Sequence, residues 1–188
     1  MSSPFAPELT VITGPMFSGK SEELLRRIKR AKIVGIPILV VKPKVDTRTN
    51  ATIKSRSGYS CRASKVGTSK EILKRVRPKH RIIFIDEAQF FDTDLPQVVI
   101  RLLRSGRRVV VSGLDLDFQE KPFVIIGQLL CLATTVLKLT AECKECCERP
   151  ATRTQRIVES EDYWVIGDET EYAARCLTCF VPSKPPPP

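Results

Sequence analysis

Residues 14–21 have the residue types and the spacing of a phosphate-binding loop. They read Gly-Pro-Met-Phe-Ser-Gly-Lys-Ser and fit the pattern G-x-x-x-x-G-K-[ST]. In this pattern two glycines let successive backbone N–H groups point inward at an anion, and the lysine brings a positive charge to the outer phosphates. The serine hydroxyl can ligate Mg²⁺, and a following helix adds the positive end of its dipole. The sequence therefore predicts a nucleotide site with phosphate contacts from Gly14, Pro15, Met16, Phe17, Ser18, Gly19, Lys20 and Ser21.

The segments on either side of this loop are those that such a loop requires. Residues 9–13 form an apolar run that predicts a buried strand. Residues 21–31 predict a helix, because Leu24, Leu25, Ile28 and Ala31 recur on one side of it. Strand, loop and helix in this order are the confirming context for the motif. The alternative, a glycine turn before an ordinary helix, is less consistent with these neighbours.

Two carboxylates follow another apolar run. Residues 81–85 predict a buried parallel strand, and Asp86 and Glu87 come directly after it. In phosphate-loop enzymes an Asp at this place holds the Mg²⁺, and the next carboxylate can serve as a base. The alternative, acids that only mark the end of a strand, is disfavoured by the phosphate loop upstream.

Residues 44–68 have little hydrophobic periodicity and are predicted to form a long, mobile loop. Loops of this length in compact domains are usually functional. The triplet Asp46, Thr47 and Arg48 lies just past the predicted strand at 36–42, where α/β sheets hold ligands. From the residues alone, ligand binding and an ordinary charged surface loop are equally consistent with this triplet.

The order of apolar segments predicts the fold class. Strands are expected at 9–13, 36–42, 81–85, 107–113 and 136–140, alternating with helices at 21–31, 69–76, 95–105 and 124–135. Such alternation predicts an α/β fold: a P-loop (RecA-like) parallel sheet flanked by helices. The expected organisation is a flexible tail at 1–8, the nucleotide-binding domain at 9–140, a small zinc-binding module with a substrate-binding loop at 141–181, and a Pro-rich tail at 182–188.

Two cysteine pairs define the C-terminal module. Cys143-x-x-Cys146 is followed, after 29 residues, by Cys176-x-x-Cys179, a spacing typical of a tetrahedral Zn²⁺ site. Four thiolates leave no coordination position for substrate, so the metal would be structural. A redox role is the alternative, although a single C-x-x-C would suffice for it. Cys147 leaves the assignment of the first pair open. Between the pairs, short strands are expected at 156–158 and 163–167, and a loop at 168–175.

The charge and the hydropathy of the chain argue against nucleic-acid and membrane partners. The 188 residues carry 31 Lys and Arg against 21 Asp and Glu, a net charge of +10. Because the basic residues are spread over the chain, a solvated surface is favoured over nucleic-acid binding. No apolar run approaches the length of about 20 residues that crosses a membrane, and the first residues lack the pattern of a signal peptide. A cytoplasmic protein with no membrane and no nucleic-acid partner is therefore expected.

Taken together, several segments resemble the type II thymidine kinases, the cytosolic thymidine kinases of bacteria, animals and poxviruses. They are residues 14–21, Asp-Glu-Ala-Gln-Phe-Phe at 86–91, Gly-Leu-Asp-Leu-Asp-Phe-Gln-Glu-Lys-Pro-Phe at 113–123, Lys-Leu-Thr-Ala at 138–141 and the two cysteine pairs. The resemblance implies ATP-dependent phosphorylation of the 5′-hydroxyl of thymidine, with Mg²⁺ and a structural Zn²⁺. It also implies a homotetramer and feedback inhibition by thymidine triphosphate.

The resemblance assigns roles to particular residues. Glu87 matches the general base, Lys20 and Arg48 would place positive charge on the phosphates, and Ser21 and Asp86 would hold Mg²⁺. The implied ATP contacts are residues 14–21 together with Asp46, Thr47, Arg48, Asp86, Glu87, Ala88 and Gln89. The implied nucleoside contacts are Met16, Phe90, Leu114, Phe118, Thr154, Tyr163, Trp164, Val165, Ile166, Gly167 and Tyr172. Of these, 163–167 match the lasso loop, which would bind the base edge mainly through backbone groups.

Two other function classes are less consistent with these residues than a thymidine kinase is. A phosphate-loop ATPase acting on nucleic acid would fit the basic charge and the zinc module. Such an enzyme would normally interleave aromatic and basic residues for strand binding, whereas here the aromatic residues gather beside the acids and in the lasso. A nucleotide-binding regulator without catalysis would be expected to lack Glu87, which is present.

Overall fold

The computed structural model describes residues 6–48, 50–55, 58–160, 162, 165 and 167–182. Its centre is a six-stranded sheet in the order β5-β2-β6-β7-β1-β8, in which every pairing is parallel. The strands of this sheet are β1 (Glu8–Thr13), β2 (Ile38–Pro43), β5 (Ser64–Val66), β6 (Ile82–Ile85), β7 (Arg108–Ser112) and β8 (Thr135–Lys138). This confirms the predicted parallel α/β sheet.

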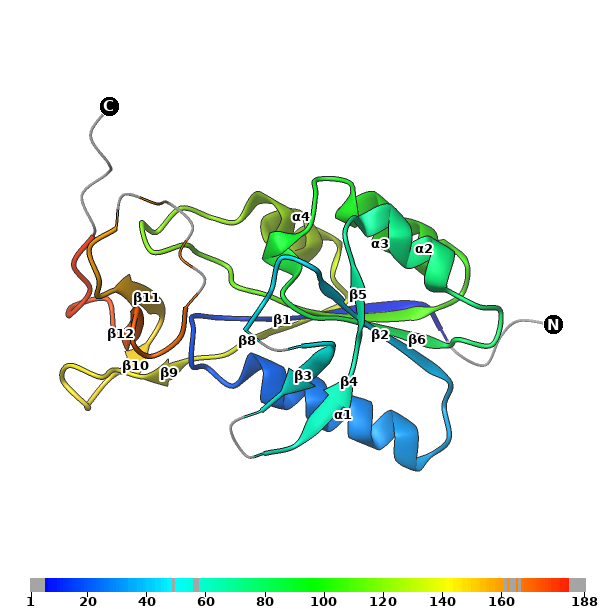
Figure 1. Ribbon diagram of the computed structural model, residues 1–188, viewed down its shortest axis with the longest axis horizontal. Coiled ribbons are helices and arrows are strands. Elements are labelled where there is room, and N and C mark those ends of the chain that lie inside the picture. The colour runs from blue at the N-terminus through cyan, green and yellow to red at the C-terminus, as the bar shows by residue number, and fades with distance from the viewer. Residues whose placement is uncertain are drawn as a thin grey trace.

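Helices cover both faces of the sheet (Figure 1). Helix α1 (Lys20–Ile33) lies on one face, with Leu24, Leu25, Ile28 and Ala31 buried as the periodicity predicts. Helices α2 (Ser69–Arg75), α3 (Leu95–Arg104) and α4 (Val124–Leu132) lie on the other, together with the short 3₁₀ helix η1 (Ala88–Phe90). The central strands are buried on both sides, which explains why they are continuous apolar runs. Among the described residues, no helix has both the length and the apolar character that crossing a membrane requires.

The prediction of a structureless loop at 44–68 is wrong. Strands β3 (Thr52–Lys54) and β4 (Ser60–Arg62) form an antiparallel hairpin, and β5 joins the edge of the main sheet beside β2. Each hairpin strand has a single buried apolar residue, Ile53 and Cys61, and both belong to the core cluster that contains α1. One apolar residue in a three-residue strand leaves no periodicity to detect.

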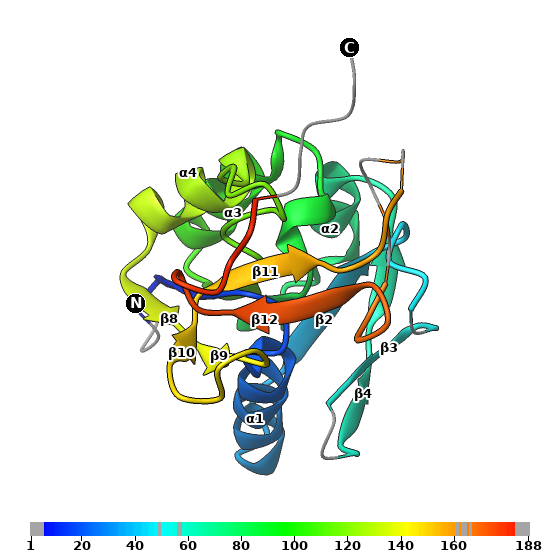
Figure 2. The same cartoon turned by 90° about the vertical axis from the view of Figure 1, so that its left-hand side faces the viewer.

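The C-terminal module consists of two small antiparallel pairs, β9 (Ala141–Glu142) with β10 (Pro150–Ala151) and β11 (Arg153–Arg156) with β12 (Tyr172–Arg175). The strand expected at 156–158 lies instead at 153–156, and the loop expected at 168–175 ends in β12. Strand β11 reads Arg-Thr-Gln-Arg and its buried residues, Thr154 and Arg156, are polar, so no apolar pattern marks it. Figure 2 shows this module standing in front of one end of the main sheet.

Candidate functional site

The phosphate loop leaves β1 and enters α1 as the motif requires. Gly14 has a φ of 136°, and a Cβ placed there would lie 2.2 Å from the carbonyl oxygen of Leu139, so no side chain fits. Further along, Phe17 and Gly19 also have positive φ values, of 68° and 81°. The loop is therefore wound tightly against the end of β8.

Lys20 lies in a cavity over this loop, here named the loop cavity. Its Nζ donates hydrogen bonds to the Pro15 carbonyl at 2.5 Å and to the Ser18 hydroxyl at 3.4 Å. Burial lowers the pKa of Lys20 to about 8, against the opposing effect of the carboxylates of Glu87, Asp115 and Asp86. The loop cavity is lined by Met16, Phe17, Gly19, Lys20, Ser21, Glu22, Arg48, Lys54, Ser55, Glu87, Leu114 and Asp168.

The two acids after β6 lie in different environments. Asp86 is 5% exposed and accepts a hydrogen bond from the Ser112 hydroxyl at 2.6 Å. Burial, with the negative charge of Glu87 beside it, raises the pKa of Asp86 to about 7. Glu87 lines the loop cavity and has a left-handed backbone, with φ 51° and ψ 47°. Such a conformation is costly for a residue other than glycine, and it is found often at functional sites.

Arg48 links the triplet at 46–48 to these acids. Its Nη2 lies 2.5 Å from Glu87 Oε1, and its Nε donates to Asp46 Oδ1 at 2.9 Å. The second oxygen of Glu87 accepts a hydrogen bond from Gln89 Nε2, also at 2.5 Å. The carboxylate of Glu87 is thus held from both sides, at the boundary between two cavities.

The second cavity, here named the apolar cavity, adjoins the first. Met16, Arg48, Glu87 and Leu114 line both cavities. The other residues that line the apolar cavity are Gln89, Phe90, Leu116, Asp117, Phe118, Phe123, Thr154, Val165, Gly167 and Tyr172. Aliphatic and aromatic walls with a few polar groups are typical of a small-molecule pocket.

Hydrogen bonds fix the walls of the apolar cavity to the phosphate loop and to one another. The backbone N–H of Met16 donates to the Thr154 hydroxyl at 2.9 Å, which joins the loop to β11. The Tyr172 hydroxyl donates to the Val165 carbonyl at 2.7 Å. On the opposite side, Gln89 Oε1 accepts from the backbone N–H of Leu114 at 3.1 Å.

Most of the predicted residues come together around the two cavities. Every predicted nucleoside contact within the described part of the chain lines the apolar cavity, whereas Tyr163, Trp164 and Ile166 lie outside the described residues. Ala88 is fully buried in the core and lines neither cavity, and Gln89, expected at the phosphates, lines the apolar one. Asp46 is 3% exposed and lines neither cavity, but it contacts Arg48, which lines both. The chemical roles assigned to these residues stay predictions.

Several lining residues were not predicted. Lys54 and Ser55 reach the loop cavity from the β3–β4 hairpin, which lies in the segment predicted to be a loop. Leu116 and Phe123 come from the segment at 114–123, where the apolar residues Leu114, Leu116 and Phe118 alternate. That alternation was the available signal for a wall of the pocket.

The four cysteines converge at the base of the C-terminal module. The sulfur atoms of Cys143, Cys146, Cys176 and Cys179 all lie within 4.8 Å of one another. Burial would raise the pKa of Cys143, but backbone N–H groups of Cys146, Cys176 and Glu145 lower it to about 6. The neighbouring sulfur of Cys176 raises the pKa of Cys179 to about 12. Four crowded sulfurs can all be thiolates only around a cation, so the donor set fits a metal such as Zn²⁺.

Comparison with known proteins gives a consistent result. The thymidine kinase family matches residues 7–180 of the chain. A thymidine kinase of Mycoplasma mobile is 45% identical over 174 residues, which cover 92% of this chain and 86% of that protein. A thymidine kinase of Mesomycoplasma hyopneumoniae is 45% identical over 173 residues, which cover 91% of this chain and 94% of that protein. Domain III of the Thermotoga maritima replication initiation protein DnaA aligns with a TM-score of 0.43 and 16% identity, over 72% of this chain and 56% of that one, which supports no further argument.

The lowered pKa of Lys20 makes polyphosphate binding dependent on pH. A bound polyphosphate favours the ammonium form, so binding above pH 8 must take up a proton that the free protein has lost. We expect the affinity for ATP to fall as pH rises through about 8, by up to about tenfold per pH unit. Equilibrium dialysis of ATP between pH 7 and 10 measures this. Lys20→Met should bind more weakly and lack this slope; an equal slope in the variant would assign the effect to another group.

Proposed function

This chain belongs to the thymidine kinase family, and from that premise we propose that it transfers the γ-phosphate of ATP to the 5′-hydroxyl of thymidine. The observation that carries the proposal is the position of Glu87 at the junction of the two cavities. A carboxylate between a phosphate loop and an apolar pocket lies where an acceptor hydroxyl from the pocket would meet a phosphate from the loop. Phosphoryl transfer requires such an in-line meeting.

Glu87 is proposed as the general base. Its carboxylate would accept the proton of the 5′-hydroxyl while that oxygen attacks the γ-phosphorus and the bond to the β-phosphate oxygen breaks. Each oxygen of Glu87 already has a partner, Arg48 on one side and Gln89 on the other. Two such contacts restrict the rotation of the carboxylate, so the base is oriented before substrate arrives.

Positive charge for the transferring phosphoryl group is proposed to come from Lys20 and Arg48. Both line the loop cavity, and the burial that lowers the pKa of Lys20 also strengthens its interaction with an anion. Backbone N–H groups of the loop and the start of α1 would hold the remaining phosphate oxygens.

Mg²⁺ is proposed to bind between Ser21 and Asp86. The donor set fits, since a hydroxyl and a carboxylate are the oxygen ligands that this ion prefers. The raised pKa of Asp86 also fits, because a buried acid beside a second carboxylate is stabilised in its charged form by a cation. When bound, the ion would offset the negative charge of the phosphates.

The apolar cavity is proposed to hold the thymine base. Met16, Leu114 and the aromatic rings of Phe118 and Tyr172 offer walls for a flat ring and its methyl group. Val165 and Gly167 of the proposed lasso also line the cavity, where main-chain donors and acceptors could read the base edge. The hydrogen bond from the Tyr172 hydroxyl to the Val165 carbonyl holds this part of the cavity wall in place.

A structural Zn²⁺ is proposed at Cys143, Cys146, Cys176 and Cys179. Closed four-sulfur sites stabilise folding and leave no position for substrate. The two cysteine pairs flank the segment that carries Thr154, Val165 and Tyr172, so the metal would fix both ends of the nucleoside-binding wall.

Three broader expectations are proposals as well. A cytoplasmic location suits four reduced thiolates, which metal sites of reducing compartments typically use. A homotetramer and inhibition by thymidine triphosphate are inferred from family resemblance, and such an inhibitor would fit a site that joins a base pocket to a phosphate loop. An ATPase acting on nucleic acid is not favoured, because the chain belongs to the thymidine kinase family and the aromatic residues Phe90, Phe118 and Tyr172 line a small apolar pocket.

The direct test is phosphoryl transfer to a panel of nucleosides. With ATP and Mg²⁺, the wild-type protein should phosphorylate thymidine fastest, measured by chromatography of the labelled monophosphate. Transfer to none of the nucleosides would overturn the proposal. Glu87→Gln should keep ATP affinity and lower kcat on the order of 10²- to 10⁴-fold, because it removes the base.

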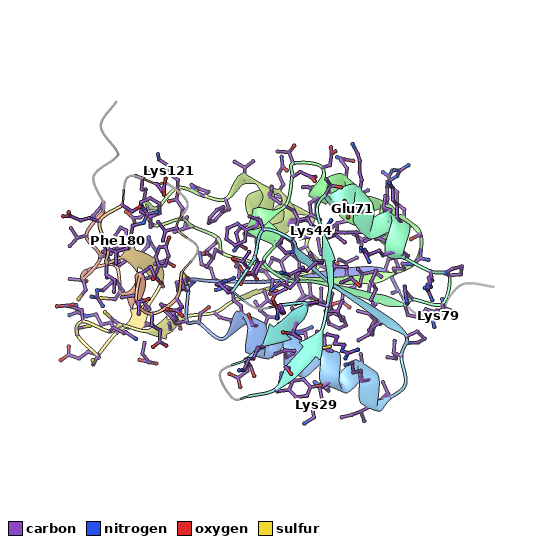
Figure 3. All side chains as sticks on the ribbon, in the orientation of Figure 1. Lys29, Lys44, Glu71, Lys79, Lys121 and Phe180 are labelled. Carbon is purple, nitrogen blue, oxygen red and sulfur yellow. The ribbon has the colours of Figure 1, made fainter. Side chains whose placement is uncertain are left out.

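The matched control for this variant is Glu71→Gln. Glu71 lies on α2 (Figure 3) and lines neither cavity, so its replacement should leave kcat unchanged. A Glu87→Gln variant that turns over at the wild-type rate would remove Glu87 from the role of base.

Metal content tests the cysteine cluster. The wild-type protein should contain about one zinc per chain by elemental analysis. Cys176→Ser should lose the metal and raise the KM for thymidine, because the nucleoside-binding wall loses its anchor. Cys147→Ser is the control: Cys147 is exposed and outside the cluster, so this variant should keep its zinc. Zinc lost from Cys147→Ser but kept in Cys176→Ser would show that the ligand set is wrong.

A further inference from the structure

Lys42 is a buried cation that neither cavity uses. It lies near the end of β2, and its side chain is 1% exposed. Lysine is almost never buried to this extent without a partner. Here the ammonium Nζ lies 2.7 Å from Asp46 Oδ2, and it also donates to the Thr52 carbonyl at a longer 3.4 Å.

The contact with Asp46 begins a row of alternating charges that ends at the proposed base. Asp46 uses its other oxygen, Oδ1, to accept from Arg48 Nε at 2.9 Å and from the Arg48 backbone N–H at 3.3 Å. Arg48 Nη2 then lies 2.5 Å from Glu87 Oε1. Lys42, Asp46, Arg48 and Glu87 therefore alternate in sign from the interior of the sheet to the junction of the cavities.

We propose that Lys42 is a positioning residue for phosphoryl transfer: it fixes the carboxylate of Asp46, which holds the guanidinium of Arg48 against Glu87. This inference rests on the proposed kinase function. Lys42 lines neither cavity, so we place its effect on the transfer step in its contact with Asp46, which holds Arg48.

Lys42 and Arg48 bind different oxygens of Asp46, and this explains how Lys42 affects the orientation of the Arg48 guanidinium. While Lys42 binds Oδ2, only Oδ1 faces Arg48, and the guanidinium is held by Nε. Without the ammonium, the buried carboxylate has one counter-charge fewer and must turn toward Arg48 or take up a proton. Either change alters the position of the guanidinium, and with it the restraint on Glu87. Small displacements of reacting groups are costly in rate.

The second contact of Lys42 reaches the hairpin over the loop cavity. Thr52 is the first residue of β3, and the same strand ends at Lys54, which lines that cavity beside Ser55. One ammonium thus contacts both segments that follow β2 and approach the phosphate loop: the triplet at 46–48 and the hairpin. The Thr52 contact is the longer of the two, so the proposal places the effect of Lys42 on the transfer step in its contact with Asp46.

The test compares four variants with the wild type, which is first shown to phosphorylate thymidine. Lys42→Met keeps the length of the side chain and removes its charge; we expect kcat to fall on the order of 10- to 100-fold with the KM for thymidine unchanged. Lys44→Met is the control, since Lys44 is exposed two residues further along the same segment, and its kcat should stay at the wild-type value. Asp46→Leu should lower kcat at least as much as Lys42→Met.

The double variant Lys42→Met/Asp46→Leu separates positioning from mere stability. Removing both charges leaves no unpaired buried ion, so Tm should recover toward the wild-type value. The kcat should nevertheless equal that of Asp46→Leu, because Lys42 acts through Asp46 and adds nothing once Asp46 is gone. If Lys42→Met does not fold, equality between the double variant and Asp46→Leu still supports the proposal.

Three results would overturn the role of Lys42 and leave the kinase function intact. They are a wild-type kcat in Lys42→Met, a kcat that recovers together with Tm in the double variant, and losses that multiply in the double variant. A wild-type protein that transfers phosphate to no nucleoside would overturn both proposals.

Discussion

The parallel pairing of β1, β2, β6 and β7 is the constraint on which the rest of the structure depends. Their registers align Val11 with Val111, Ile85 with Val111 and Val41 with Ile85, so the strands end at nearly the same level. Each polar segment that follows a strand therefore emerges at one edge of the sheet. The phosphate loop, the triplet at 46–48, the two acids and the loop at 114–123 meet there although up to about a hundred residues separate them.

The features predictable from the sequence are those that local chemistry determines. The phosphate loop needs glycine where a side chain cannot fit, as Gly14 shows against Leu139. Strands buried on both faces must be continuous apolar runs, so the central sheet could be predicted. The hairpin β3–β4 could not, because Ile53 and Cys61, its single buried apolar residues, gain burial only in the cluster that contains α1. Strand β11 could not, because its buried residues Thr154 and Arg156 are polar. No local pattern records a contact that exists only after folding.

The residues of the candidate site also fall into those that local sequence predicts and those that only tertiary contacts place. Its acids follow an apolar run and its lysine belongs to the phosphate-loop motif, so local sequence predicts them. Lys54, Ser55 and Asp168 come from segments whose place is set by tertiary packing. Lys42 is the clearest case. At the end of the run Ile-Leu-Val-Val-Lys-Pro it resembles an ordinary strand terminus, and only the folded chain brings Asp46 and Thr52 to its ammonium. A residue that acts through a neighbour leaves no motif.

The hydrogen bond from the Met16 N–H to the Thr154 hydroxyl joins a residue that lines both cavities to the C-terminal module. Phe17, the next residue of the phosphate loop, also packs against the cluster of Ala141, Cys143 and Ala174 in the C-terminal module. A ligand that rigidifies the loop would thereby also rigidify the wall of the other pocket, and the second ligand would then lose less conformational entropy on binding. The two binding equilibria would then be linked, and by reciprocity each ligand would tighten the other by the same factor. The C-terminal module in this way joins, through Met16 and Phe17, two cavities that distant parts of the chain build.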